Sequence, residues 1–167
     1  MPAGSATDTA FLADQLQRMY AGEAWHGPSV TDALTGVTAA QASAHSSGNA
    51  HSIHELAHHI HAWMAECRRR LGGSVPMMPS EGNFPPPGAT VDEPAWKALR
   101  ARLDSEHTAL MADVRAFNPA RWHEKTPGAF DDPTPVATTF LGLMHGLVQH
   151  HAYHAGQIML LRRAMGA

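Results

Sequence analysis

The sequence predicts an all-α protein, a four-helix bundle with two long connections. Four segments carry apolar residues at helical spacing. Strand signals are weak, because no hairpin dipeptide stands between alternating apolar runs. Apolar residues make up 44% of the 167 residues, which suits one domain with a sizeable core. We therefore expect a single four-helix-bundle domain over residues 1–167.

The first long helix is expected from about Thr7 to Ala21, where apolar residues recur at helical spacing until Gly22. Two short helical turns are expected after it, over residues 28–34 and 38–44. The polar stretch 46–50 then reads as a loop.

The second long helix has a sharply defined start. Ser52 and Glu55 have the spacing of a capping box, in which each side chain binds the other's backbone amide. The helix is expected to run to Leu71, because Gly72 and Gly73 follow as a stop signal.

The last two helices are marked by their caps. Asp92 is expected to cap the third, which ends before the Asn118-Pro119 pair. Thr134 and Pro135 are expected to open the fourth, which continues to about Met165.

Two long connections link these helices, over residues 74–90 and 122–133. The first is rich in Pro and Gly and is expected to run over the surface. Loops of this length are often functional, so we expect residues 74–90 to cover the mouth of a site.

Composition excludes several classes of function. The net charge is -3 and the Lys and Arg are scattered, so no basic patch for nucleic acid is expected. The chain has no run of 18 apolar residues and no signal-peptide pattern at its N-terminus. A single Cys excludes a disulfide within the chain. We expect a cytoplasmic protein with neither a membrane nor a nucleic-acid partner.

The chain contains 13 His, and helical geometry sorts those of the fourth helix. With His154 as the reference direction, His150 lies about 40° away, within the apolar face. His151 lies about 60° off, near the edge of that face, and His145 lies on the opposite, solvent side. The apolar face is formed by Phe140, Leu143, Leu147, Ile158 and Leu161.

On the second helix only His59 is expected to flank the core, because it lies beside Leu56 and Trp63 of the apolar stripe. The other histidines, at positions 54, 58 and 61, fall on the opposite side and are expected to form a solvated face.

Two imidazoles spaced i, i+4 on a buried face can converge on one metal ion, and His59 is the candidate third ligand. Three ligands form an open site, whereas a structural zinc site has four. Nitrogen ligands suit Zn, Ni, Fe or Cu. The alternative is a pair of buried histidines satisfied by hydrogen bonds. The sequence contains no H-E-x-x-H motif, which excludes a zincin.

Three segments resemble the DinB/YfiT-like family. They are the histidine-rich stretch 150–158, the stretch 53–63 with a His four residues before a Trp, and the segment 20–29 with its Trp-His-Gly-Pro-Ser run. The resemblance extends from about Leu12 to Ala164.

This resemblance implies a four-helix bundle, often a homodimer, with a metal held by three histidines. Carried over by motif, these ligands are His59, His150 and His154. Family members include thiol-dependent enzymes, namely bacillithiol S-transferases and a mycothiol-dependent maleylpyruvate isomerase, and metal-dependent hydrolases. His151 stands where relatives often carry Asp, so His151 is a candidate for orienting a ligand from behind the metal or for lining the pocket, in a different way from a carboxylate.

The leading hypothesis is a thiol S-transferase-like enzyme acting on a small molecule. One divalent metal (Zn, Ni or Fe) would activate a low-molecular-weight thiol or water at its open position. Candidate pocket residues are Tyr153, Gln157, His26 and Trp25, although each also fits packing or capping. Cys67 is not expected to be a nucleophile, because no base is specified for it.

Three alternatives use the same residues differently. A metal-dependent hydrolase would activate water alone. A non-catalytic metal-binding, sensing or stress-response module would hold the ion without a selective pocket. In an interaction protein the histidine pair would be purely structural. Metal content and turnover distinguish these classes.

Overall fold

The structure is all-helical, as the sequence predicts. A computed structural model describes residues 5–45, 51–86, 88–128 and 139–166, and these ranges contain no strand. None of the helices described there has the length and apolar content to cross a membrane. The helices are α1 (Ala6–Ala21), α2 (Val30–Leu34), α3 (Ala39–Ser43), α4 (Ile53–Leu71), α5 (Glu93–Ala116) and α6 (Phe140–Ala164), with a 3-10 turn η1 (Pro119–Arg121).

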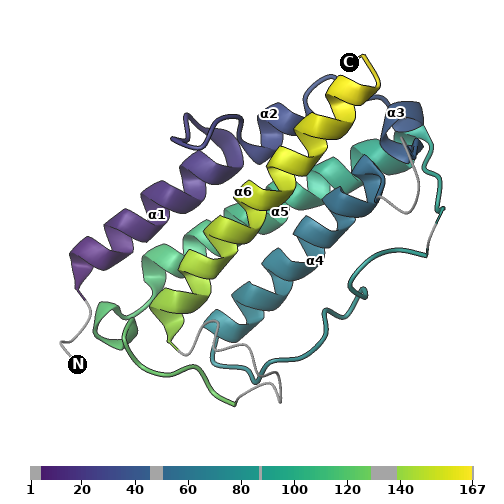
Figure 1. Cartoon of the computed structure of the whole chain (residues 1–167). Coiled ribbons are helices and arrows are strands. Elements are labelled where there is room, and N and C mark those ends of the chain that lie inside the picture. The colour runs from purple at the N-terminus through teal and green to yellow at the C-terminus, as the bar shows by residue number, and fades with distance from the viewer. Residues whose placement is uncertain (1–4, 46–50, 87, 129–138, 167) are drawn as a thin grey trace.

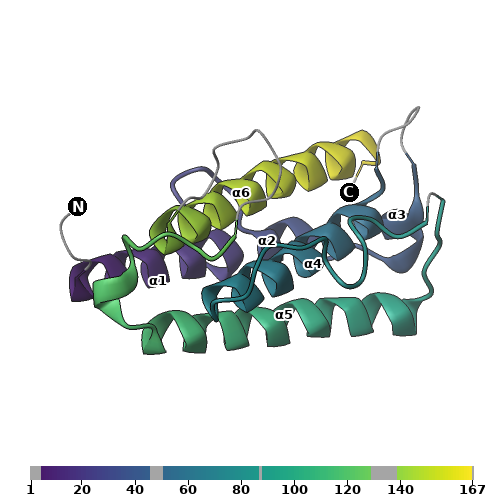
Figure 2. The ribbon, with the colours of Figure 1, turned by 90° about the horizontal axis from the view of Figure 1, so that it is seen from below.

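The four long helices α1, α4, α5 and α6 form the bundle (Figure 1). Each of α4 and α1 packs against both α5 and α6, so α4 and α1 lie diagonally across from each other. Helices α1 and α6 run in one direction and α4 and α5 in the other (Figure 1). Because the consecutive helices α4 and α5 are parallel, the chain between them has to return along the length of α4 (Figure 2). This explains the long connection that follows α4.

The predicted capping box at the start of α4 is confirmed. The amide of Glu55 donates to the Ser52 hydroxyl at 3.2 Å, and the amide of Ser52 donates to the Glu55 carboxylate at 3.0 Å. Both residues are buried, and α4 ends at Leu71 with Gly72 as its C-cap.

The start of α6 differs from the prediction. The described helix begins at Phe140 with Thr139 as its cap, and the Gly142 amide donates to the Thr139 hydroxyl at 3.0 Å. The amides of Phe140 and Leu141 donate to loop carbonyls at 3.1 and 2.8 Å, which anchors the first turn beside η1. The expected cap at 134–135, part of the loop 122–133, and the polar stretch 46–50 lie outside the described residues.

One apolar core joins all six helices. Two buried indoles link the outer segments to this core. The Trp96 Nε1–H donates to the Val37 carbonyl at 2.8 Å, and the Trp122 Nε1–H donates to the Thr9 hydroxyl at 2.7 Å. Buried Trp side chains usually find such a partner, and here the partners fix the segment after α2 and the start of α1.

The buried arc of α6 is rotated relative to the prediction. His151 is fully buried rather than at the edge of the apolar face, and His150 is half-buried rather than central. Helix α6 packs against α4 on one side and α1 on another, so its buried arc spans both contacts. His145 is exposed, as predicted.

The prediction of a solvated histidine face on α4 is wrong. His61 is buried, and His54 and His58 are half-buried. The strap (residues 74–86) covers this side, and its Glu81 carboxylate lies 3.3 Å from His61 Nδ1. Arg102 of α5 closes the same side, with Nη2 3.2 Å from His61 Nδ1.

Candidate metal centre

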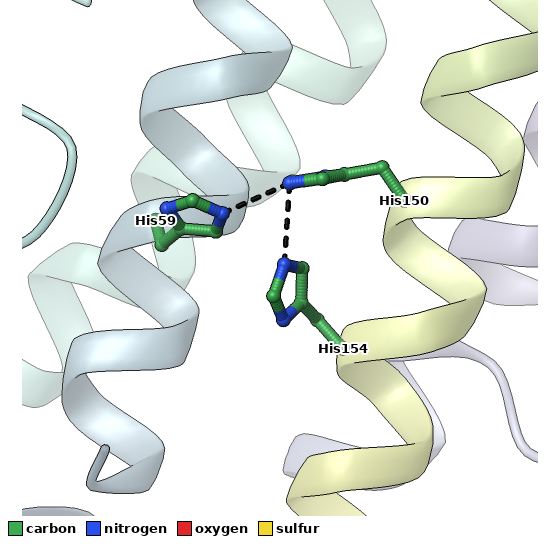
Figure 3. Close-up of side chains that lie close together, drawn as sticks. All are labelled: His59, His150 and His154. Carbon is green, nitrogen blue, oxygen red and sulfur yellow. Dashed lines mark hydrogen bonds between the residues drawn. The ribbon is translucent and has the colours of Figure 1, made fainter. Parts of the chain in front are cut away.

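Three histidines converge between α4 and α6 (Figure 3). His59 Nε2 lies 2.9 Å from His150 Nε2, and His154 Nε2 lies 3.2 Å from the same atom. One ring nitrogen from each of the three lies within 4.8 Å of the others. With Zn–N bonds of 2.0–2.1 Å, the nitrogens of a tetrahedral zinc site lie about 3.3 Å apart. The two distances from His150 Nε2 are close to this spacing, as expected for ligands of a metal ion of this kind.

The three histidines come from two helices that pack against each other. His150 and His154 lie one turn apart on α6, so their rings project from the same side of the helix. His59 lies on α4, which packs directly against α6. The structure thus brings together the same three residues that helical geometry and the family resemblance single out.

The outer nitrogens of two rings have acceptor partners. His59 Nδ1–H donates to the Asn83 backbone carbonyl at 2.9 Å, and His154 Nδ1–H donates to the Gln157 side-chain oxygen at 2.6 Å. A neutral imidazole carries one proton, so the Nε2 of both rings presents a lone pair to the centre. This is the form in which a histidine binds a metal.

His150 differs from the other two. Its Nδ1 is buried and has no partner among the described residues. Its Nε2 faces the lone pairs of His59 Nε2 and His154 Nε2, so a proton on this atom would bond to one of them when no metal is bound. Ligation through His150 Nε2 requires this proton to be at Nδ1 instead.

Burial keeps the three rings neutral. It is the main cause that lowers the pKa of His150 to about 2 and that of His59 to about 4. Burial also lowers the pKa of His154. Neighbouring histidines lower these pKa values further, because two imidazolium charges repel each other at this distance. At neutral pH the centre therefore consists of three uncharged ligands.

Aromatic rings surround the centre. Phe84 of the strap stacks on His59 with ring centroids 4.3 Å apart and an interplanar angle of 8°. Trp63 presents its edge to His59 at 6.2 Å. Tyr153 lies edge-on to His154 at 5.0 Å and is 65% exposed, so a solvent-facing side chain borders the centre on this side.

Gln157 links two of the predicted site residues. Its side-chain oxygen accepts from His154, and its side-chain amide donates to the Tyr153 hydroxyl at 3.2 Å. The structure therefore places both Tyr153 and Gln157 next to the histidine triad.

His151 does not bond to the triad. Its Nδ1–H donates to the Leu147 carbonyl at 2.9 Å, one turn earlier in α6. Its ring centroid lies 5.6 Å from that of His150. His151 packs behind the ligands in the fully buried core, and it orients none of them by a hydrogen bond.

Trp25 and His26 are not brought to the triad. Both are exposed, and both line a surface hollow together with Val148 of α6. Val148 lies about 160° around α6 from His150, because two residues advance the helix by about 200°. These two candidates therefore occupy another side of the bundle.

Cys67 is buried in α4, and burial raises the pKa of its thiol to about 12. A buried thiol with a high pKa has almost no nucleophilic thiolate, which agrees with the expectation that it is not a nucleophile.

The residues missed by sequence reasoning are Asn83 and Phe84. Both belong to the strap and both touch His59. The sequence indicated that this segment covers a site, but no spacing rule links a loop residue to a helix side chain 24 positions earlier.

The sequence also matches a known protein family. The sequence matches the DinB superfamily over residues 24–158, a range that contains all three histidines. The chain belongs to the DinB superfamily. No curated protein and no solved structure matched the chain. The DinB resemblance of the sequence motifs is thus confirmed at the level of the superfamily, and the match extends from the segment after α1 into α6.

Proposed function

We propose that this DinB-superfamily protein binds one divalent transition metal ion, Zn, Ni or Fe, through the Nε2 atoms of His59, His150 and His154. One observation carries the proposal: three neutral imidazole nitrogens converge, and two of the rings are held by acceptors in the tautomer that binds a metal. Three protein ligands leave a coordination position open for a small molecule.

We further propose that the protein is a metal-dependent enzyme that acts on a small molecule, as a thiol S-transferase does. A bound metal would supply Lewis acidity that activates a low-molecular-weight thiol or water. Phe84 and Trp63 shield His59 from solvent, which strengthens electrostatic interactions at the centre. We propose that the Tyr153 hydroxyl hydrogen-bonds a substrate, because Tyr153 is exposed beside the ligands.

Elemental analysis tests the metal centre. We expect about one metal per chain in the wild type, and loss of the metal in His59→Ala, His150→Ala and His154→Ala. His145→Ala is the matched control, because His145 is exposed on the same helix as two of the ligands. A wild-type protein that takes up none of Zn, Ni and Fe contradicts the proposal.

Turnover distinguishes the reaction classes. The metal-loaded protein is assayed with small electrophiles, with and without a panel of low-molecular-weight thiols. We expect product only when a thiol is present. Turnover without thiol assigns the chain to the hydrolases, and metal binding without any turnover assigns it to the non-catalytic modules.

The assembly and location are also proposals. The family resemblance implies a homodimer, and light scattering of the purified protein would show twice the 17.9 kDa chain mass. We propose a cytoplasmic location, which fractionation of the source cells tests.

A further inference from the structure

The strap lies against α4 along most of the length of that helix (Figure 2). Near its start, the Arg69 side chain donates to the Val75 carbonyl, and the Met77 amide donates to the Glu66 carboxylate at 3.0 Å. Glu66 is itself buried and paired with Arg69 at 2.8 Å. The strap is therefore docked by specific polar bonds, and not only by apolar contact.

Near its end, the strap touches the proposed metal centre. The Asn83 backbone carbonyl accepts from His59 Nδ1–H, and its side-chain carbonyl accepts from Trp63 Nε1–H at 2.8 Å. Phe84 stacks on one face of the His59 ring. Two consecutive strap residues thus fix the His59 imidazole at its edge and at its face.

Glu81 anchors this part of the strap to two helices. Its carboxylate bonds to the Arg102 guanidinium of α5 and lies 3.3 Å from His61 Nδ1 and 3.7 Å from His58 Nε2 of α4. Gly82 follows with φ of +83°, a left-handed conformation that favours glycine. The single turn at Gly82 therefore connects Glu81, which is bound to Arg102, with the Asn83 carbonyl, which accepts from His59.

We propose that Asn83 and Glu81 are positioning residues of the metal centre: the Asn83 carbonyl sets the tautomer and ring orientation of His59, and Glu81 keeps that carbonyl in place. This inference rests on the proposed metal site. The nitrogen that carries the proton of an imidazole is set by the hydrogen bond that the other nitrogen makes. Without the Asn83 carbonyl, His59 Nε2 is free to hold the proton and loses its lone pair for the metal.

A pair of variants tests the role of Glu81. Glu81→Ala removes the anchor, and Glu106→Ala is the matched control, because Glu106 pairs with Arg68 at 2.6 Å and so joins α5 to α4 rather than to the strap. Zinc affinity is measured by competition with a chelator. Loss of an outer-shell partner typically weakens metal affinity about 10–100-fold. We expect a loss in this range for Glu81→Ala and an unchanged affinity for Glu106→Ala. Equal zinc affinity in the wild type and Glu81→Ala would overturn the inference.

A second measurement does not need a metal. Nitrogen NMR of the histidine side chains reports the His59 tautomer in the metal-free protein. We expect the Nδ1–H form in the wild type and Glu106→Ala, and a mixture with the Nε2–H form in Glu81→Ala. A wild type that shows the Nε2–H form overturns the inference. If the wild type binds no zinc but shows the expected tautomers, the proposed function fails while the positioning role of the strap stands.

Discussion

Gln157 supports His154 with an uncharged amide rather than a carboxylate. Replacement by Ala removes the acceptor of His154 Nδ1–H, so the ring loses both its preferred tautomer and its orientation. We expect Gln157→Ala to weaken metal binding about 10–100-fold. Competition with a chelator measures this effect.

The control for this variant is Gln149→Ala, which changes an exposed Gln on the same helix. It should bind metal as the wild type does. If the two variants bind equally well, Gln157 has no part in holding His154.

His107 makes the fold sensitive to acid. It is 6% exposed and stacks on Tyr20 at 4.0 Å, and burial lowers its pKa to about 4. In the unfolded chain a histidine titrates near 6.5, so the unfolded state takes up a proton first as the pH falls. Protonation of His107 therefore leaves the free energy of unfolding unchanged above about pH 6.5. Between about pH 6.5 and pH 4 it lowers that free energy progressively, by up to about 3 kcal/mol in total.

Urea unfolding of the metal-free protein at pH 7 and pH 4.5 measures this loss. We expect His107→Gln to lose less stability between the two pH values than the wild type. His145→Gln, at an exposed position, should keep the wild-type difference. An equal pH difference in His107→Gln and the wild type would exclude this explanation.

At the scale of the helix, α4 starts with a capping box whose two residues, Ser52 and Glu55, are both buried. Ser52 is 0% exposed, whereas Ser5 at the start of α1 is exposed. Ser52→Ala leaves the Glu55 amide without its acceptor in a buried place. We expect a loss of about 1–2 kcal/mol in the free energy of unfolding, and a smaller loss for Ser5→Ala. Chemical denaturation measures both values, and a larger effect at Ser5 would contradict the argument.

The helices that the sequence predicts well are those with local start signals. Ser52 and Asp92 cap helices through residues three positions away, so a short stretch of sequence is enough to find them. Helix α6 also has a local cap, Thr139, but the sequence offers Thr134 and Pro135 as an equally good start. The cap that the helix uses lies next to the carbonyls of Trp122 and Glu124, which the fold brings to the first turn. No local pattern carries that information.

The same distinction applies to the candidate site. The His150 and His154 pair is visible in the sequence because its spacing is that of one helical turn. The contact of Asn83 with His59 depends on the parallel course of α4 and α5, which forces the strap back along α4. The burial of His61 was missed for the same reason, since its cover belongs to the strap and α5.

At the scale of the whole molecule, the proposed metal joins α4 to α6. An ion that binds only the folded state raises the free energy of unfolding by about 2.7 kcal/mol when it is present at 100 times its dissociation constant. We expect zinc to raise the melting temperature of the wild type and of His145→Ala, but not that of His59→Ala. Differential scanning calorimetry measures the shift. An equal rise in His59→Ala would indicate that zinc binds elsewhere.

The burial of Cys67 affects how the proposed thiol-dependent reaction can be assayed. The only thiol of the chain is buried and strongly held in its protonated form. An enzyme whose substrates are electrophiles can be alkylated at its own cysteines. Here the single thiol is buried and protonated, so it reacts poorly with electrophiles. Any thiolate consumed in the presence of the native protein therefore comes from the added cosubstrate, so its disappearance can be followed directly without a background from the protein.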